Sequence, residues 1–223
     1  MAAFVHLVRH AEIDNPDHLV CGSLPGFGLS PYGIEQARRV ARYLGPRPVV
    51  AIWSSPQERA LRTAEEIAAR SGVPVRVHQD LTDWRLMERW KGHPWNAISE
   101  LFPGEIEAYL AHPDDLDFVE EQLTEVAARV ARVARALDAE HPHGDVVIVS
   151  HQDSLQAGLL HLTGADLGQL HDARPVSGEV VTLRPGPAWR LETTWEPSDR
   201  PRFGEKSDLR LVKAGKTDGP SPA

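Results

Sequence analysis

The sequence predicts an α/β fold, a three-layer sandwich whose mostly parallel central sheet has helices on both faces and a lid-like insertion. Short apolar runs that predict buried strands alternate along the chain with longer segments of helical periodicity, which is the pattern of a parallel sheet covered on both sides. The 223 residues are enough for one α/β domain. No apolar run approaches the ~20 residues that cross a bilayer, so no membrane association is expected.

The first strand and helix flank a long loop. Residues 4–8 are a compact apolar run and predict a buried parallel strand. Residues 13–29 are rich in Pro, Gly, Asp and Asn and predict a loop. Ser30 and Pro31 are then typical of the N-cap and the first position of a helix.

A second strand and helix follow, and then an irregular segment. Residues 49–53 predict a strand, and Pro56 is expected to open a helix that Gly72 closes. Residues 73–77 predict a short strand. Residues 81–112 show no regular periodicity, and we expect them to form a lid over a site, with an apolar part of the pocket shaped by Trp84, Trp90 and Trp95.

The second half of the chain repeats the alternation. A long helix is expected after residues 113–115, with a core-facing stripe made of Val126, Val130, Val133 and Leu137. Residues 145–149 predict the most clearly buried strand, followed by a helix to about residue 162. Residues 180–183 and 189–195 predict a hairpin at the edge of the sheet, and an exposed edge strand there makes a homodimer possible.

No repeat or linker divides residues 1–196, which are expected to form a single domain with the insertion at 81–112. Residues 197–223 are polar and contain several prolines, so we expect a tail that is disordered at its end. The N-terminus leads directly into a strand without a positively charged leader, and the only cysteine is Cys21. Both observations favour a cytoplasmic location.

Charge and motif spacing exclude several classes of function. The formal net charge is -8, from 24 basic and 32 acidic residues, whereas a dedicated nucleic-acid binder has a basic surplus. The remaining histidines have none of the spacings of a metal site, and the chain has no P-loop segment. We therefore expect no metal, no cofactor and no nucleic-acid partner.

Two of the predicted strands end in residues that hold or attack phosphate. Arg9 and His10 follow the first strand, and Ser150 and His151 follow the strand at 145–149. Arginine offers a planar fork of donors to phosphate oxygens, and histidine is easily poised as a neutral nucleophile. Because ligands bind beyond the carboxyl ends of parallel strands, we expect the two pairs to converge. A helix that begins near residue 152 would also aim free N–H groups at an anion.

Together with two further stretches, these pairs resemble a known family. The stretches are Leu7-Val8-Arg9-His10-Ala11-Glu12, Ser55-Pro56-Gln57-Glu58-Arg59-Ala60-Leu61-Arg62-Thr63-Ala64, a carboxylate near residue 83, and Ser150-His151. The pattern resembles the histidine phosphatase superfamily, also called the phosphoglycerate-mutase-like family, over roughly residues 4–184. The resemblance implies that His10 forms a phosphohistidine and that the phosphate is bound by Arg9, Arg59 and His151.

The resemblance also implies a general acid that protonates the leaving alkoxide. Asp83 stands where the family places a glutamate, after a leucine and ahead of Trp90-Lys91-Gly92. Glu88 is the rival candidate, because its longer side chain could reach in from the lid. Gln152 and Asp153 replace two glycines that usually follow the second histidine. An aspartate beside a phosphate is unfavourable unless it turns away.

The expected function is hydrolysis of a small phosphorylated metabolite through a phosphohistidine on His10. One alternative is a cofactor-dependent mutase, but the segment 88–92 shares only its first two residues with the corresponding segment of the glycolytic mutases. The other alternative is a catalytically impaired phosphate-binding module, which the substitutions at Gln152 and Asp153 would suit.

Overall fold

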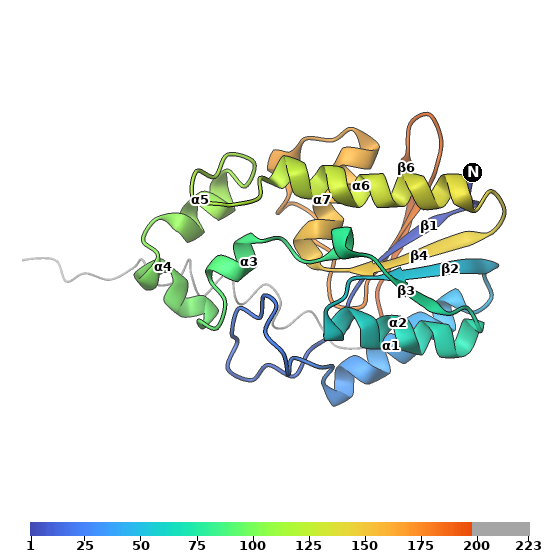
Figure 1. The fold of residues 1–223 in the computed structure, drawn as a ribbon, viewed down its shortest axis with the longest axis horizontal. Helices are drawn as coiled ribbons and strands as arrows, with labels where there is room; N and C mark the ends of the chain where they lie inside the picture. The colour runs from blue at the N-terminus through green and yellow to red at the C-terminus, as the bar shows by residue number, and fades with distance from the viewer. Residues whose placement is uncertain (198–223) are drawn as a thin grey trace, which may run out of the picture.

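The structure, a computed structural model that describes residues 1–197, contains a six-stranded sheet between two layers of helices (Figure 1). The strand order is β3-β2-β4-β1-β5-β6. The first four of these strands are parallel, whereas β5 and β6 run antiparallel to their neighbours. The strands are β1 Val5–Arg9, β2 Val49–Ser54, β3 Val75–Val77, β4 Asp145–Ser150, β5 Val180–Arg184 and β6 Arg190–Trp195.

Helices cover both faces of the sheet, as predicted. Figure 1 shows α6 and α7 on one face and α1 and α2 on the other. The α-helices are α1 Pro31–Leu44, α2 Glu58–Ser71, α3 Leu86–Arg89, α4 Ile98–Leu101, α5 Glu105–Ala111, α6 Leu123–Glu140 and α7 Gln152–Thr163. The 3-10 helices of residues 1–197 are η1 Gln79–Leu81, η2 Trp95–Ala97 and η3 Leu167–Gln169. None of the helices in residues 1–197 has the length and apolar character that a membrane crossing requires.

Local sequence signals account for the regular elements. Ser30 caps α1, and its side chain accepts a hydrogen bond from the backbone N–H of Gly33. Every residue of β4 is buried, as expected of a central parallel strand. The predicted stripe of α6 is buried against the sheet and α7 at Val126, Val130, Val133 and Leu137. The hairpin of β5 and β6 lies at the edge of the sheet, also as predicted.

The segment 81–112 differs from its prediction. Instead of being irregular, it contains the short helices α3, α4 and α5, which pack with the first turns of α6 and with Ala157 of α7 into a second hydrophobic cluster. Trp84 and Trp90 are fully buried in that cluster, so the prediction that they shape the pocket is wrong. α2 also begins at Glu58 rather than at Pro56.

The topology brings distant motifs to one edge of the sheet. β1 and β4 are parallel neighbours, and Arg9 lies opposite Ser150 in the register. β2 borders β4 on its other side, so the start of α2 lies at the same edge. The predicted tail begins at residue 197, and its residues 198–223, including the end that we expect to be disordered, lie outside the described residues.

Candidate active site

The phosphate-directed residues of the sequence converge at the carboxyl ends of β1, β2 and β4. The ring centroids of His10 and His151 lie 5.3 Å apart. A cavity of about 530 Å³ opens there, and its wall includes Arg9, His10, Arg59, Asp83 and His151. The predicted convergence of the two strand-end pairs is therefore confirmed.

His10 is a buried, neutral imidazole with one free nitrogen lone pair. Its Nδ1 lies 2.8 Å from the carbonyl oxygen of Ala11. A carbonyl can only accept, so Nδ1 carries the proton and Nε2 keeps the lone pair. Burial, and then the positive charges of Arg59 and Arg9, hold the pKa of His10 well below its usual value. The ring is thus in the protonation state of a nucleophile.

Arg59 is the central cation of the cavity and is only 4% exposed. Its Nη2 donates to Oδ2 of Asp83 at 3.0 Å and its Nη1 donates to the carbonyl oxygen of Gly22 at 3.2 Å. Its Nε donates to Nδ1 of His151 at 3.2 Å. These contacts fix the plane of the guanidinium. They also engage all three of its nitrogens with protein groups, so phosphate binding by Arg59 stays a prediction.

His151 has contacts at both ring nitrogens. Because Arg59 can only donate, Nδ1 of His151 is an acceptor, so Nε2 carries the proton and donates to Oγ of Ser55 at 2.8 Å. Burial and the charge of Arg59 hold the pKa of His151 well below its usual value. His151 lies in the cavity wall as predicted, but both its nitrogens contact protein groups, so donation to a phosphate stays a prediction.

The serine and threonine of the Ser55–Ala64 segment bind the ends of two strands. The backbone N–H of Ser55 donates to the carbonyl oxygen of Val149 at 2.9 Å. Oγ1 of Thr63 accepts from the backbone N–H of Ala11 at 3.0 Å and donates to the carbonyl oxygen of Arg59 at 2.8 Å. The segment thereby holds α2 against both histidine-bearing loops.

The two candidate acids lie in different places. Asp83 is in the cavity wall, 17% exposed, with Oδ2 at 3.7 Å from Nδ1 of His151. Burial raises the pKa of Asp83, Arg59 opposes the rise, and the charge of Asp153 adds to it. Such a carboxyl is more easily protonated than one in water.

Glu88 lies on α3, and its carboxylate accepts hydrogen bonds from Oγ of Ser23 at 2.8 Å and from Nζ of Lys91 at 2.7 Å. Although partial burial acts the other way, hydrogen bonds from Lys91 and Ser23 hold the pKa of Glu88 below its usual value. Glu88 is not among the residues that line the cavity. Its geometry and charge are those of a surface carboxylate.

A cluster of Tyr109, Asp153 and Arg174 closes one side of the cavity, and the sequence did not indicate it. Asp153 does not turn away. It lines the cavity, accepts a hydrogen bond from Oη of Tyr109 at 2.8 Å, and has its other oxygen 3.1 Å from Nη2 of Arg174. Arg174 supplies the positive charge that makes an aspartate tolerable there. The only available signal was the unusual Asp153 itself, which needed a cation from elsewhere in the chain.

The rest of the wall combines apolar side chains with the loop after β1. Trp95 lines it, as predicted, together with Leu19, Val20, Cys21 and Met87. Burial raises the pKa of the Cys21 thiol to about 11, so this cysteine is not a thiolate nucleophile. Arg9 lines the cavity as well, with Nη1 donating to the carbonyl oxygen of Pro175 at 2.9 Å. In residues 1–197 no group of three or more His, Cys, Asp or Glu side chains is placed to hold a metal ion.

Comparison with known proteins gives several relatives over most of the chain. The chain is 34% identical over 189 residues to an uncharacterised protein of Mycobacterium tuberculosis, covering 76% of this chain and 82% of that protein. It is 31% identical over 169 residues to phosphoserine phosphatase 1 of Hydrogenobacter thermophilus, covering 73% and 77%. It is 32% identical over 175 residues to glucosyl-3-phosphoglycerate phosphatase of M. tuberculosis, covering 72% and 76%.

Solved structures agree with this relationship. A mycobacterial glucosyl-3-phosphoglycerate phosphatase in complex with VO3 superimposes with a TM-score of 0.79 at 26% identity, covering 88% of this chain and 100% of that one. Residues 5–195 match the sequence profile of the histidine phosphatase superfamily, branch 1. With the strand-end histidines and the buried arginine placed as described, the chain belongs to the histidine phosphatase superfamily (branch 1).

Proposed function

We propose that His10 is the nucleophile of this phosphatase, Asp83 its general acid and base, and Arg9, Arg59 and His151 its phosphate-binding residues. The chain is a phosphoric monoester hydrolase for small phosphorylated metabolites, like its relatives. The observation that carries the residue assignment is the state of His10, a buried neutral ring whose Nδ1 proton is engaged by Ala11 and whose Nε2 lone pair is free.

In the first step, Nε2 of His10 attacks phosphorus. The N–P bond forms as the ester P–O bond breaks, and Asp83 gives its proton to the leaving oxygen, which departs as an alcohol. Arg59 and Arg9 stabilise the charge on the phosphoryl oxygens during the transfer.

In the second step, water attacks the phosphohistidine. The Asp83 carboxylate takes a proton from this water, the N–P bond breaks, and its electron pair returns to His10. The products are inorganic phosphate and an enzyme with Asp83 protonated again, ready for the next turnover. No metal or cofactor takes part in these two steps.

The alcohol part of the substrate would lie against the apolar wall of Leu19, Met87 and Trp95, with the charged pair of Asp153 and Arg174 beside it. Two relatives are named for phosphoserine and glucosyl-3-phosphoglycerate. Both compounds therefore belong in the first substrate panel, together with an aryl phosphate as a general substrate.

The test of the proposal is to trap the phosphohistidine. The wild type, His10→Ala and His143→Ala are mixed with an aryl phosphate and quenched in alkali, which preserves phosphohistidine. His143 lies on an exposed turn and serves as the control. We expect acid-labile phosphate and turnover in the wild type and in the His143→Ala variant, and neither in the His10→Ala variant. Turnover by a folded His10→Ala variant would remove the nucleophile assignment.

A comparison of two variants tests which carboxyl is the general acid. Asp83→Asn should lose far more activity on an alkyl phosphate, which has a poor leaving group, than on an aryl phosphate. Glu88→Gln should lose little on either substrate, since Glu88 lies outside the cavity wall. The reverse result would assign the acid to Glu88.

Two further properties belong to this proposal. A homodimer paired along β6 would use an exposed edge strand on which Leu191 is 52% exposed, and light scattering of the purified chain would detect it. A cytoplasmic location is expected from the sequence, and cell fractionation would test it.

A further inference from the structure

Arg129 on α6 binds the segment that carries Asp83. Its Nη1 donates to the carbonyl oxygens of Asp80 and Thr82 at 2.7 and 2.9 Å, and its Nη2 donates to that of Asp83 at 3.1 Å. Arg129 is only 8% exposed and is not among the residues that line the cavity. One guanidinium therefore holds three carbonyl groups of a four-residue segment.

Along this segment, the backbone carbonyl groups are bound by side chains and not by regular secondary structure. It runs from the end of η1 toward α3, so its carbonyl groups have no sheet or long helix to bind them. Oγ of Ser150 donates to the carbonyl oxygen of Leu81 at 2.7 Å, and Oγ of Ser154 donates to that of Thr82 at 3.0 Å. With Arg129, these side chains bind every carbonyl group from residue 80 to residue 83. Buried carbonyl groups need such donors, and the fork of an arginine can serve several at once.

Glu121 holds the guanidinium of Arg129 from the other side. Its Oε1 accepts from Nε of Arg129 at 2.7 Å, and the two side chains are 10% and 13% exposed. The carbonyl oxygen of Glu121 also accepts from Nε1 of Trp84 at 2.8 Å. The residue that follows Asp83 is thus fixed by the same partner, so the orientation of Arg129 and the path of the backbone at residue 83 are linked.

We infer that Arg129 is a positioning residue for the reaction: it sets the place of the Asp83 carboxyl by fixing the backbone that carries it. The inference rests on the proposed role of Asp83 as the acid. That carboxyl must meet the leaving oxygen while its Oδ2 stays 3.0 Å from Arg59 and 3.7 Å from His151. A displacement of about 1 Å can cost a reaction on the order of a hundredfold in rate.

A purely structural role for Arg129 makes a different prediction. Lost packing or stability lowers the amount of active enzyme and affects every substrate alike. Misplacement of the acid affects only substrates whose leaving group needs a proton. The ratio of kcat/KM for an alkyl phosphate to kcat/KM for an aryl phosphate separates the two cases.

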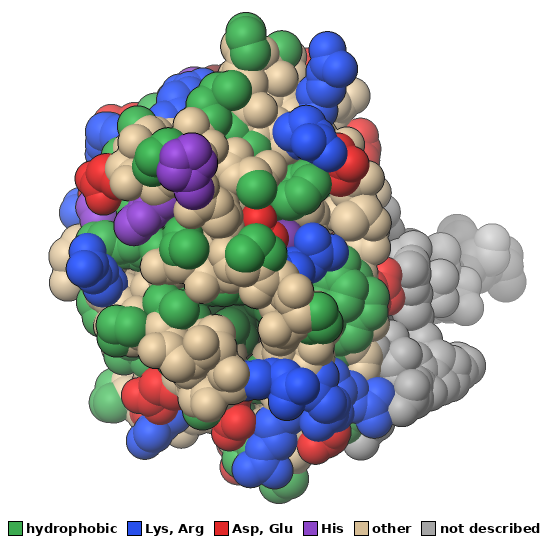
Figure 2. Space-filling view, turned by 90° about the vertical axis from the view of Figure 1, so that its right-hand side faces the viewer, with side chains coloured by type: hydrophobic (Ala, Val, Ile, Leu, Met, Phe, Trp, Pro, Cys, Tyr) green, Lys and Arg blue, Asp and Glu red, His purple; other side chains and the backbone are tan. Residues whose placement is uncertain are grey.

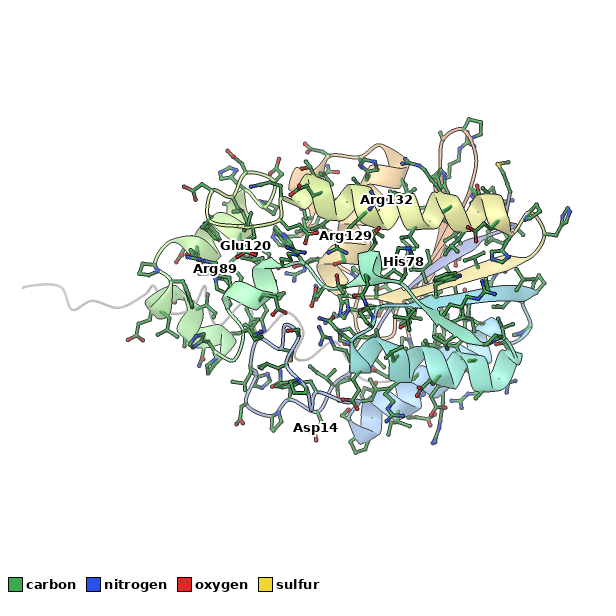
Figure 3. The ribbon with its side chains drawn as sticks, viewed as in Figure 1. Asp14, His78, Arg89, Glu120, Arg129 and Arg132 are labelled. Carbon is green, nitrogen blue, oxygen red and sulfur yellow. The ribbon has the colours of Figure 1, made fainter. Side chains whose placement is uncertain are left out.

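Arg132 provides the matched control on the same helix. Its Nη2 contacts the Asp80 carboxylate, also beside the segment, but its side chain is 64% exposed and contacts none of the carbonyl groups that Arg129 binds. Figure 3 labels both side chains on α6, with Arg129 toward the interior. Arg129→Lys keeps the charge opposite Glu121 but has one nitrogen where arginine has three, so it cannot hold all three carbonyl groups.

The experiment measures both kcat/KM values for the wild type, Arg129→Lys, Arg132→Lys and Asp83→Asn. We expect Asp83→Asn to lose about a hundredfold or more on the alkyl ester. We expect Arg129→Lys to lose about tenfold or more on the alkyl ester and at most about threefold on the aryl ester. Arg132→Lys should stay within about twofold on both.

Equal losses on both esters in the Arg129→Lys variant, or no loss, would overturn the inference while leaving the acid assignment in place. If Asp83→Asn shows no leaving-group effect, the acid role fails, and the inference fails with it. Should Arg129→Lys not fold, Ser154→Ala removes one of the two donors to the Thr82 carbonyl group. It must then lower the alkyl-to-aryl ratio, and an unchanged ratio would overturn the inference.

Discussion

Burial acts in opposite directions on the two central residues of the site. It lowers the pKa of His10, a base, and raises the pKa of Asp83, an acid, because it disfavours the charged form of each. One desolvated cavity thus keeps the nucleophile unprotonated and makes the proton donor easier to protonate. Arg59 adds to the effect on His10 and opposes the effect on Asp83.

These states predict the pH dependence of the reaction. As the pH rises through the raised pKa of Asp83, the acid loses its proton and hydrolysis of an alkyl phosphate should slow, whereas an aryl phosphate should be much less affected. His10 stays neutral well below pH 6.5, so its protonation should not limit the acid side until lower pH. The ratio of kcat/KM for the two esters, measured from pH 4 to pH 8, should therefore fall with pH.

In the Asp83→Asn variant this ratio should be low, and it should change with pH only as the two substrates ionise. An aryl phosphate is a stronger acid than an alkyl phosphate, so the variant's ratio at each pH serves as the reference for the wild type. If the wild-type ratio divided by the variant's ratio does not fall with pH, the assignment of Asp83 as the titrating group is contradicted.

The site residues that could be predicted from the sequence have a local sequence context, and those that could not be predicted lack one. Arg9, His10, Arg59 and His151 stand in motifs or at strand ends, where their chemistry can be inferred from their neighbours. Arg174 has no such context. It acquires a role only through Asp153 and Tyr109, each distant in sequence, and contacts of that range depend on the packing of the whole chain.

At the scale of elements, α1 determines the path of the loop after His10. The first turn of α1 approaches that loop so closely that a Cβ on Gly33 would lie 1.9 Å from the carbonyl oxygen of Glu12. Oε1 of Gln36 accepts a hydrogen bond from the backbone N–H of Glu12 at 2.8 Å. Oγ of Ser30 donates to the carboxylate of Glu12 at 2.7 Å. The helix therefore supports the nucleophile loop through contacts that only a glycine at position 33 allows.

We predict that Gly33→Ala forces the helix or the loop to shift. The clash is with backbone, which cannot rotate away, so the expected loss in unfolding free energy is about 1–3 kcal/mol. The expected loss in kcat/KM is about tenfold or more, since the shift acts next to His10. Urea unfolding and steady-state assays would measure the two effects.

Gly186→Ala is the control for this substitution. A Cβ there meets only an ordinary contact at 3.5 Å, in the hairpin loop far along the chain from the site. It should leave activity unchanged. Full activity in the Gly33→Ala variant would mean that the loop does not depend on this close approach.

Some helices and strands could be predicted from the sequence, and others could not. β1 and β4 could be predicted because each is a continuous apolar run, and α1 and α6 because each is long enough to show helical periodicity. The α-helices within residues 81–112 have only 4, 4 and 7 residues, which is too short for a periodic pattern. Trp84 and Trp90 looked like pocket residues because nothing in the sequence showed that they pack in one apolar cluster with residues of α6 and α7.

At the scale of the whole molecule, the acidic chain places three arginines in the wall of one cavity, where Glu12, Asp14, Asp83 and Asp153 also lie. The formal net charge is -8, yet Arg9, Arg59 and Arg174 all line one cavity. Figure 2 shows the opposite end of the molecule, where the parallel strands begin and where Lys and Arg side chains gather along one edge beside acidic ones. On α1, Arg42 pairs with Glu35, and both side chains are exposed. The cavity differs because Arg59 is buried and Arg9 and Arg174 are half-buried.

The cluster of Tyr109, Asp153 and Arg174 joins three parts of the molecule: α5, the first turn of α7 and the loop before β5. We predict that Arg174→Met lowers the unfolding free energy by about 3–5 kcal/mol, because it leaves the Asp153 carboxylate buried without a cation.

Arg62→Met is the control, since Arg62 is 60% exposed and its ion pairs are in solvent, and it should cost at most about 1 kcal/mol. Urea unfolding gives both values, and hydrogen exchange should show faster opening of α5 in the Arg174→Met variant alone. If Arg174→Met costs no more than Arg62→Met and α5 exchanges as in the wild type, α5 is held by the apolar cluster and not by this charged contact.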